Sequence, residues 1–214
     1  MMRARHSSGA PCDPGAGVAA SPRRRGDVLM RAIFDACLDQ LSTVGWKRLT
    51  MEGVAACAQT GKAALYRRWA SKQDLVVDAL DNTLPLVQDA PDHGNLRDDL
   101  LSLLERMRTV MHSPAGCALR AIMEELEHEH AEAFHSLVQR RVLEPGTGIS
   151  VEILRRGIER GEVWDDADIE LLADVAPAMM LYRAKIAGGE ITPDYPARLV
   201  DEVLVPMLRP AGPA

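Results

Sequence analysis

Apolar residues recur at every third or fourth position along most of this chain, and this spacing constrains its fold more than any other feature. Between residues 27 and 44, Leu29, Ile33, Cys37 and Leu41 follow the spacing of one face of a helix. Similar patterns cover residues 96–112, 115–129, 131–143, 149–160, 168–187 and 196–208. No strand-like alternation of convincing length interrupts them. The sequence therefore predicts an all-α fold of about nine helices.

The composition excludes several classes of protein. No apolar run approaches the roughly 20 residues that span a bilayer, and the N-terminus has no apolar core of a secretory signal. The four cysteines are scattered, with no CxxC pair. We therefore expect a cytoplasmic protein without a membrane partner, disulfide framework, metal or cofactor, in which Cys37 and Cys57 are buried thiols.

Charge and composition divide the chain into three parts. Residues 1–25 are rich in Gly, Pro and Arg without apolar periodicity, which predicts a disordered basic tail. A Pro/Asp/Gly-rich stretch at 85–94 separates a compact domain over 26–82 from a larger one over 83–214. Residues 1–82 carry 12 Lys and Arg against 8 Asp and Glu, whereas the remainder carries 13 against 23. The first part can therefore approach a polyanion that the rest would repel.

Residues 50–69 form a short helix, a turn and a second short helix. Thr50 suits the N-cap of the first helix, Gln59 to Gly61 suit the turn, and the second helix runs from Lys62 to Trp69. Helices this short need flanking helices over them, and the S-x-x-D pattern at 71–74 opens the next one. Such an arrangement, followed by basic residues, predicts a helix-turn-helix whose second helix enters the DNA major groove.

The residue types around this turn suggest how DNA would be contacted. Arg and Lys pair with guanine edges, alanine methyl groups permit close approach, and hydroxyl or basic groups bind phosphates. The candidates for contact with bases are Lys62, Ala63, Ala64 and Arg67. The candidates for contact with phosphates are Thr50, Tyr66, Arg68 and Lys72. The expected partner is double-stranded operator DNA.

Residues 27–80 resemble the DNA-binding domain of the TetR family of transcriptional regulators. The matching positions are Gly45-Trp46, Thr50, Ala58, Leu65-Tyr66, Trp69 and Ser71-Lys72. Two positions depart from the family pattern: Gln59 replaces a turn glycine, and Gly61 replaces the Ser or Thr that caps the recognition helix. Thr60 is the expected substitute for that cap.

The rest of the chain is similar to the C-terminal domain of one TetR subgroup, through the segments 95–100 and 160–163. This resemblance implies a helical regulatory domain with an effector cavity, and dimerisation through the last two long helices. The apolar pattern over 168–187 independently predicts a helix with two packed faces, one of which would meet a partner. The interface candidates are Leu172, Val175, Met179, Leu199, Val203 and Met207.

The expected effector is a flexible apolar molecule, because the few aromatic residues beyond residue 82 leave an aliphatic, sulfur-lined cavity. The pocket candidates are Met107, Met111, Met123, Phe134, Trp164, Met180 and Tyr182. These patterns predict a ligand-responsive repressor that binds a pseudo-palindromic operator as a homodimer and is released by the effector.

Three alternatives remain open from the residues. His128, Glu132 and His135 would share one helix face, which permits a metal-responsive regulator. An enzyme is the second alternative, but GTG at 146–148 lacks the lysine of a phosphate-binding loop, and no catalytic grouping stands out. An effector-binding adaptor that does not bind DNA is the third, because Gln59 and Gly61 alter the turn.

Overall fold

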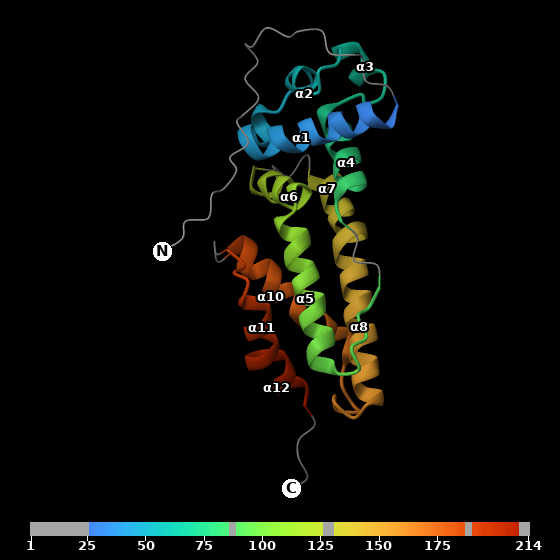
Figure 1. The fold of residues 1–214 in the computed structure, drawn as a ribbon, viewed down its shortest axis with the longest axis vertical. Coiled ribbons are helices and arrows are strands. Elements are labelled where there is room, and N and C mark those ends of the chain that lie inside the picture. Colours follow the sequence, from blue (N-terminus) through green and yellow to red (C-terminus); the bar gives the residue numbers. More distant parts are fainter. Residues whose placement is uncertain (1–25, 86–88, 126–130, 187–189, 210–214) are drawn as a thin grey trace. The chain divides into compact units, whose positions relative to one another are not determined.

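A computed structural model describes residues 26–85, 89–125, 131–186 and 190–209 (Figure 1). Every regular element in these ranges is helical, which confirms the predicted all-α fold. The predicted tail at 1–25 lies outside the described residues. The chain divides into a head unit, residues 1–82 with 121–126, and a body unit, residues 83–120 with 127–214. No helix among the described residues is long and apolar enough to cross a membrane.

The head unit packs two short helices with two longer helices. It contains α1 (Asp27–Arg48), α2 (Met51–Cys57), α3 (Lys62–Tyr66), almost all of α4 (Lys72–Thr83) and the last residues of α6 (Pro114–Glu125). Each of α2 and α3 supplies only a few core side chains, so both depend on α1 and α4. The side chains with no or almost no exposed surface include Ile33, Cys37, Leu41, Val54, Leu65, Leu75 and Leu80.

Helix α1 has a sharp kink at Gly45, one of the positions that match the family pattern. Gly45 has φ 79° and ψ 174°, after which one more helical turn carries Trp46 to Arg48. This backbone conformation strains any residue that has a Cβ atom. The kink brings Trp46 into the core of the head unit, where the side chain is buried.

Two predicted caps and one predicted contact are confirmed. The Thr50 hydroxyl accepts a hydrogen bond from the Gly53 N–H at 3.1 Å, at the start of α2. Ser71 and Asp74 form the reciprocal capping box of α4: the Ser71 N–H donates to the Asp74 carboxylate at 3.0 Å, and the Asp74 N–H to the Ser71 hydroxyl at 3.1 Å. Trp69 packs onto α4 and donates from Nε1 to Asp78 Oδ2 at 2.9 Å.

The body unit consists of helical segments, several of which follow one another through a π-helical turn. In chain order they are α5 (Leu96–His112), the first part of α6, α7 (Ala131–Val138), η2 (Gln139–Leu143), α8 (Glu144–Glu159), α9 (Ile169–Ala173), α10 (Val175–Leu181), η3 (Tyr182–Ile186), α11 (Tyr195–Leu199), η4 (Val200–Leu204) and α12 (Val205–Leu208). Both α8 and α10 pack against α5, and so do α11 and η4.

Prolines explain where the helices differ from the sequence prediction. The expected break at 144–148 is wrong, because α7, η2 and α8 follow one another without interruption. Pro145 has no N–H to donate, and the π-helical turn just before it accommodates the missing bond. Conversely, the helix expected over 168–187 is interrupted at Asp174, three residues before Pro177.

A buried ion pair joins the start of α5 to the end of α8. Asp99 has no exposed surface, and it accepts from the backbone N–H of His93 at 2.6 Å and from Arg160 Nη2 at 3.1 Å. Glu162 accepts from the backbone N–H of Leu96 at 2.7 Å and pairs with the same arginine. The segments 95–100 and 160–163, which carry the resemblance of this half, are therefore in direct contact.

Candidate nucleic-acid interface

Helix α3 presents one apolar face to the core and the opposite face to solvent. Leu65 is fully buried, whereas Lys62 and Ala63 are exposed and Ala64 is half-buried. Arg67, at the C-cap of this helix, is also exposed. The structure therefore brings the four predicted base-contacting residues together on one five-residue helix and its cap.

The turn before α3 takes the conformation that the family glycine would favour. Gln59 has φ 54°, and it is the one non-glycine residue with positive φ among the described residues. Gly61 is the N-cap of α3 and provides no side-chain hydrogen bond, so the substitute cap expected at Thr60 is not the N-cap. Recognition helix α3 still begins at Lys62, as the sequence predicts.

Lys62 is held by neighbours within the head unit. Its ammonium group pairs with the Glu52 carboxylate on α2 and lies 5.5 Å from the centre of the Tyr66 ring. The hydrogen bond from Lys62 lowers the pKa of Glu52, and the same bond raises the pKa of Lys62. Both groups are therefore charged near neutral pH.

The predicted phosphate-contacting residues have different surroundings. Tyr66 and Arg68 are exposed, close to the C-terminal end of α3. Thr50 is exposed at the start of α2, where its hydroxyl already caps the helix. Tyr66 and Arg68 are thus accessible beside α3, and Thr50 is accessible at the first turn of α2.

Lys72 is tied to the interior of the head unit. Its Nζ donates to the carbonyl oxygens of Trp46 at 2.8 Å and Leu49 at 3.4 Å, and lies 4.4 Å from the centre of the Trp46 ring. Partial burial lowers the pKa of this amine. Lys72 thus closes the last turn of α1 onto the start of α4.

Glu125 makes a contact in the head unit that sequence reasoning missed. Its carboxylate, at the end of α6, accepts a hydrogen bond from the Lys47 backbone N–H at 2.9 Å. A Cβ atom on Gly45 would clash with its Oε1. The two segments are far apart in the sequence, so no spacing pattern could have joined them. The one available signal was the Gly45-Trp46 pair. It matches the family pattern, but it does not identify Glu125 as the residue in contact with this segment.

Two family descriptions together match most of the chain. Residues 33–79 match "Bacterial regulatory proteins, tetR family", and residues 90–203 match "Tetracyclin repressor-like, C-terminal domain". This chain belongs to the TetR family. It is a transcriptional regulator of that family.

Relatives along nearly the whole chain agree with this assignment. A "DNA-binding transcriptional repressor TetR" of Mycobacteroides abscessus is 32% identical over 189 residues, 88% of this chain and 98% of its own. An uncharacterized HTH-type regulator of Mycobacterium bovis is 34% identical over 164 residues, 77% of this chain and 80% of its own.

Solved structures show the same fold. The TetR-family regulator SCO0332 has a TM-score of 0.54 at 27% identity, covering 86% of this chain and all of its own. FadR of Bacillus subtilis, solved with stearoyl-CoA, has a TM-score of 0.63 at 14% identity, covering 81% of this chain and 95% of its own. The latter likeness concerns the fold alone.

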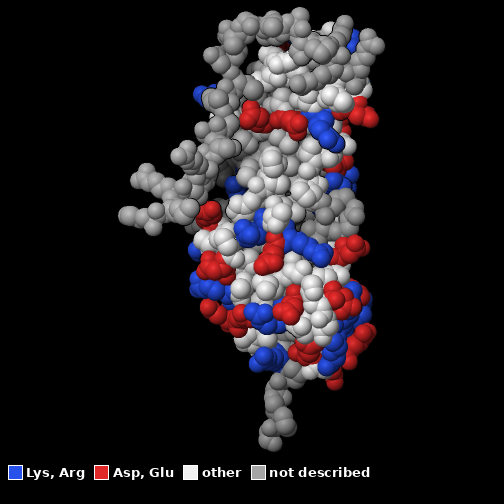
Figure 2. All heavy atoms as spheres, in the orientation of Figure 1, with Lys and Arg blue, Asp and Glu red and all other residues white. Residues whose placement is uncertain are grey.

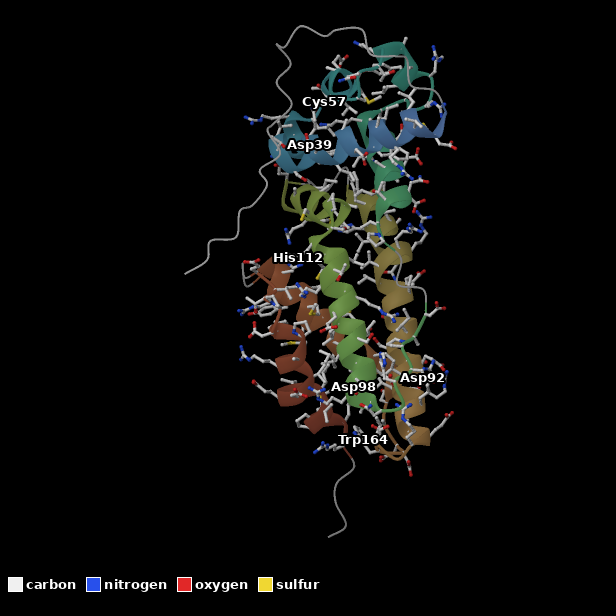
Figure 3. The ribbon with its side chains drawn as sticks, viewed as in Figure 1. Asp39, Cys57, Asp92, Asp98, His112 and Trp164 are labelled. Atoms are coloured by element: carbon white, nitrogen blue, oxygen red, sulfur yellow. The ribbon has the colours of Figure 1, made fainter. Side chains whose placement is uncertain are left out.

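The predicted effector residues of this TetR-family regulator lie in several parts of the structure. Met107, Met111 and Trp164 are half-buried against the core that contains Met180. However, Figure 3 shows Trp164 beyond one end of α5 and His112 at the opposite end of this helix. Met111 is next to His112 in the sequence. The remaining three candidates are Phe134, which is fully buried, Tyr182, which is 51% exposed, and Met123, which belongs to the head unit.

An open groove is found elsewhere in the body unit. Its volume is about 640 Å³, and none of the seven predicted effector residues lines it. The lining residues are Gln139, Leu143, Glu144, Thr147, Asp174, Pro177, Ala178 and Leu181. Asp174 and Thr147 are joined across it by a hydrogen bond of 3.3 Å.

The predicted interface residues fall into three groups by exposure. Val203 and Met207 are exposed, and Leu172, Val175 and Met179 are half-buried. Leu199 is only 3% exposed, so it has little surface to offer a partner. The structure adds three exposed apolar residues on the same stretch of chain, Leu171, Leu181 and Tyr182.

The metal alternative gains no support from the described residues. Within them, no group of three or more His, Cys, Asp or Glu could hold a metal ion. His135 is exposed, and His128 lies outside the described residues. On the face of the body unit seen in Figure 2, acidic and basic side chains are intermingled.

Proposed function

We propose that this repressor binds a pseudo-palindromic operator as a homodimer, with one α3 helix in each of two major-groove half-sites. The observation that carries this proposal is the exposed face of α3, where Lys62, Ala63 and Arg67 stand opposite the buried Leu65. Basic side chains at such positions pair with guanine O6 and N7. In a two-fold dimer the half-sites would be about one DNA turn, roughly 34 Å, apart or more widely spaced.

Two arginines distinguish base reading from backbone binding. Arg67→Ala should lose about 1–3 kcal/mol of discrimination at one base position. Arg68→Ala should weaken binding to all sequences and reduce the slope of log affinity against log salt by about 1. Fluorescence anisotropy with operator and single-base variants measures both effects. If neither substitution changes binding, α3 is not the element in the groove.

Dimerisation is proposed through α10, η3, η4 and α12. These elements carry four exposed apolar residues, Leu181, Tyr182, Val203 and Met207. Two further residues of α10, Val175 and Met179, are half-buried. Burying apolar side chains between two copies would remove them from water. Val203→Asp should shift the sedimentation equilibrium towards monomer, whereas Val28→Asp, at an exposed valine of α1, should not. Equal dimerisation of both variants would place the interface elsewhere.

The effector is proposed to bind in the body unit beside α5. Met107 and Met111 lie half-buried there, against the core that contains Met180. The Nε of Arg108 is buried and has no hydrogen-bond acceptor among the described residues. An unpaired buried donor favours a ligand that brings an acceptor. We therefore expect an apolar molecule with an acidic group.

The repressor would leave the DNA if the effector favours a conformation in which the spacing of the two head units does not match that of the operator half-sites. A straight-chain carboxylic acid should then weaken operator binding more than the alcohol of the same length. Arg108→Met should abolish that difference, while Arg106→Met, at an exposed position of α5, should keep it. Equal potency of acid and alcohol on the native protein would contradict the acidic group. Repression of bacterial genes would take place in the cytoplasm, where the DNA is.

A further inference from the structure

Glu52 stands beside the recognition helix and engages its first residue. Glu52 lies in the first turn of α2, and its carboxylate forms an ion pair with Lys62. The side chains of Lys62 and Glu52 are 60% and 52% exposed. Lys62 also lies over the ring of Tyr66. One of the two cations among the proposed base-contacting residues is therefore engaged before DNA arrives.

This ion pair is weak enough for DNA to open. Exposed ion pairs contribute little because water and salt screen them. Once Lys62 leaves, however, the ionised Glu52 carboxylate loses its cationic partner beside a polyanion. Release of Lys62 is thus favourable only where the DNA replaces the lost partner with strong acceptors of its own.

Guanine and the phosphate backbone differ in this respect. Guanine offers two acceptors, O6 and N7, in a fixed position in the major groove. Non-specific binding depends mainly on basic side chains that replace counterions along the phosphates. A lysine that is already paired with a carboxylate contributes little to non-specific binding along the phosphates. It remains available for contact with guanine.

We propose that Glu52 is a specificity-determining residue, which withholds Lys62 from non-specific phosphate contacts and releases it at a site with guanine acceptors. The inference rests on the proposed position of α3 in the groove. It concerns the ratio of operator to non-specific affinity rather than operator binding itself.

Three variants and a matched control test this role. Glu52→Gln removes the negative charge and keeps the shape, Lys62→Met removes the positive charge, and the double variant joins both changes. Asp35→Asn is the control, because Asp35 is an exposed carboxylate on α1 of the same unit. Each protein is titrated against its selected operator and a scrambled duplex of equal length, at several salt concentrations. Thermal unfolding verifies that each is folded, and Glu52→Ala serves as a second substitution.

We expect Glu52→Gln to steepen the salt dependence for the scrambled duplex by about 1, so that a fourfold decrease in salt adds about 3.5-fold more affinity than in the native protein. Affinity for the operator should change less, so the specificity ratio falls. In the Lys62→Met background, Glu52→Gln should act no more strongly than Asp35→Asn.

Other results overturn the inference in distinguishable ways. If Glu52→Gln and Asp35→Asn have the same effect, only the overall charge of the head matters. If Glu52→Gln weakens binding to both duplexes, Glu52 positions Lys62 for DNA instead of withholding it. If the native protein binds no duplex in a salt-dependent way, the proposed function itself fails and the inference fails with it.

Discussion

The carboxylate of Glu125 accepts a hydrogen bond from the backbone N–H of Lys47, 78 residues earlier in the chain, at 2.9 Å. Lys47 follows the kink at Gly45, and Glu125 is the last residue of α6. Most of α6 belongs to the body unit, whereas its last residues belong to the head unit. The hydrogen bond therefore joins the end of α6 to the segment after the kink, within the head unit.

Gly45→Ala tests how closely the kink depends on this arrangement. The substitution should reduce the free energy of unfolding by about 1–2 kcal/mol, because φ 79° strains a residue with a Cβ atom. The new methyl group would also displace the Glu125 side chain. Urea unfolding measures the loss.

Glu125→Ala gives the second arm of a double-mutant cycle. In the double variant the Gly45→Ala change should destabilise less than it does alone, because no carboxylate remains to be displaced. Strict additivity of the two substitutions would show that the two residues do not interact.

Gln59→Gly should stabilise the protein. Gln59 holds φ 54°, a conformation that is unfavourable for side chains with a Cβ atom and neutral for glycine. We expect a gain of about 0.5–1 kcal/mol in thermal unfolding, after the larger entropy of glycine in the unfolded chain is subtracted. Gln73→Gly, inside α4, is the control and should destabilise by about 1 kcal/mol. A loss of stability in Gln59→Gly would contradict the role of this turn.

Lys72→Met separates a structural role from the predicted phosphate contact. Loss of the bonds to the carbonyl groups of Trp46 and Leu49 should lower the free energy of unfolding by about 1–2 kcal/mol. The slope of log affinity against log salt should stay unchanged, unlike that of Arg68→Ala. Native stability combined with a slope reduced by about 1 would instead identify Lys72 as a phosphate contact.

Alkaline pH should weaken the head unit through Cys37. Burial raises the pKa of this thiol from 9.0 to about 12, so the folded protein keeps a proton that the unfolded chain loses. Stability should fall by about 1.4 kcal/mol per pH unit between those values. Cys37→Ala should flatten this dependence relative to the native protein, whereas Cys57→Ala should not. Identical pH profiles for the native protein and Cys37→Ala would exclude Cys37 as the cause.

Local patterns were sufficient to predict the helix-turn-helix. The caps at Thr50 and Ser71, the kink at Gly45 and the exposed face of α3 each depend on residues within one or two turns of each other. Pro145 and Pro177 were misjudged, because neighbouring residues decide whether a proline ends, bends or enters a helix. Contacts between distant segments, such as Glu125 with Lys47 and Lys72 with Trp46, leave no periodic signal. The effector candidates were predicted from residue type alone, and they lie in several segments of both units.

Selection of bound DNA from a random pool tests the central claim most directly. The full-length protein is incubated with a random duplex library, and the bound fraction is amplified and sequenced over several rounds. The exposed faces of two α3 helices related by a two-fold axis predict an enriched pseudo-palindrome that contains guanine in each half-site. Arg67→Ala should relax one symmetric pair of positions in that motif. Recovery of no enriched sequence, or of an asymmetric motif that Arg67→Ala leaves intact, would contradict operator recognition by α3.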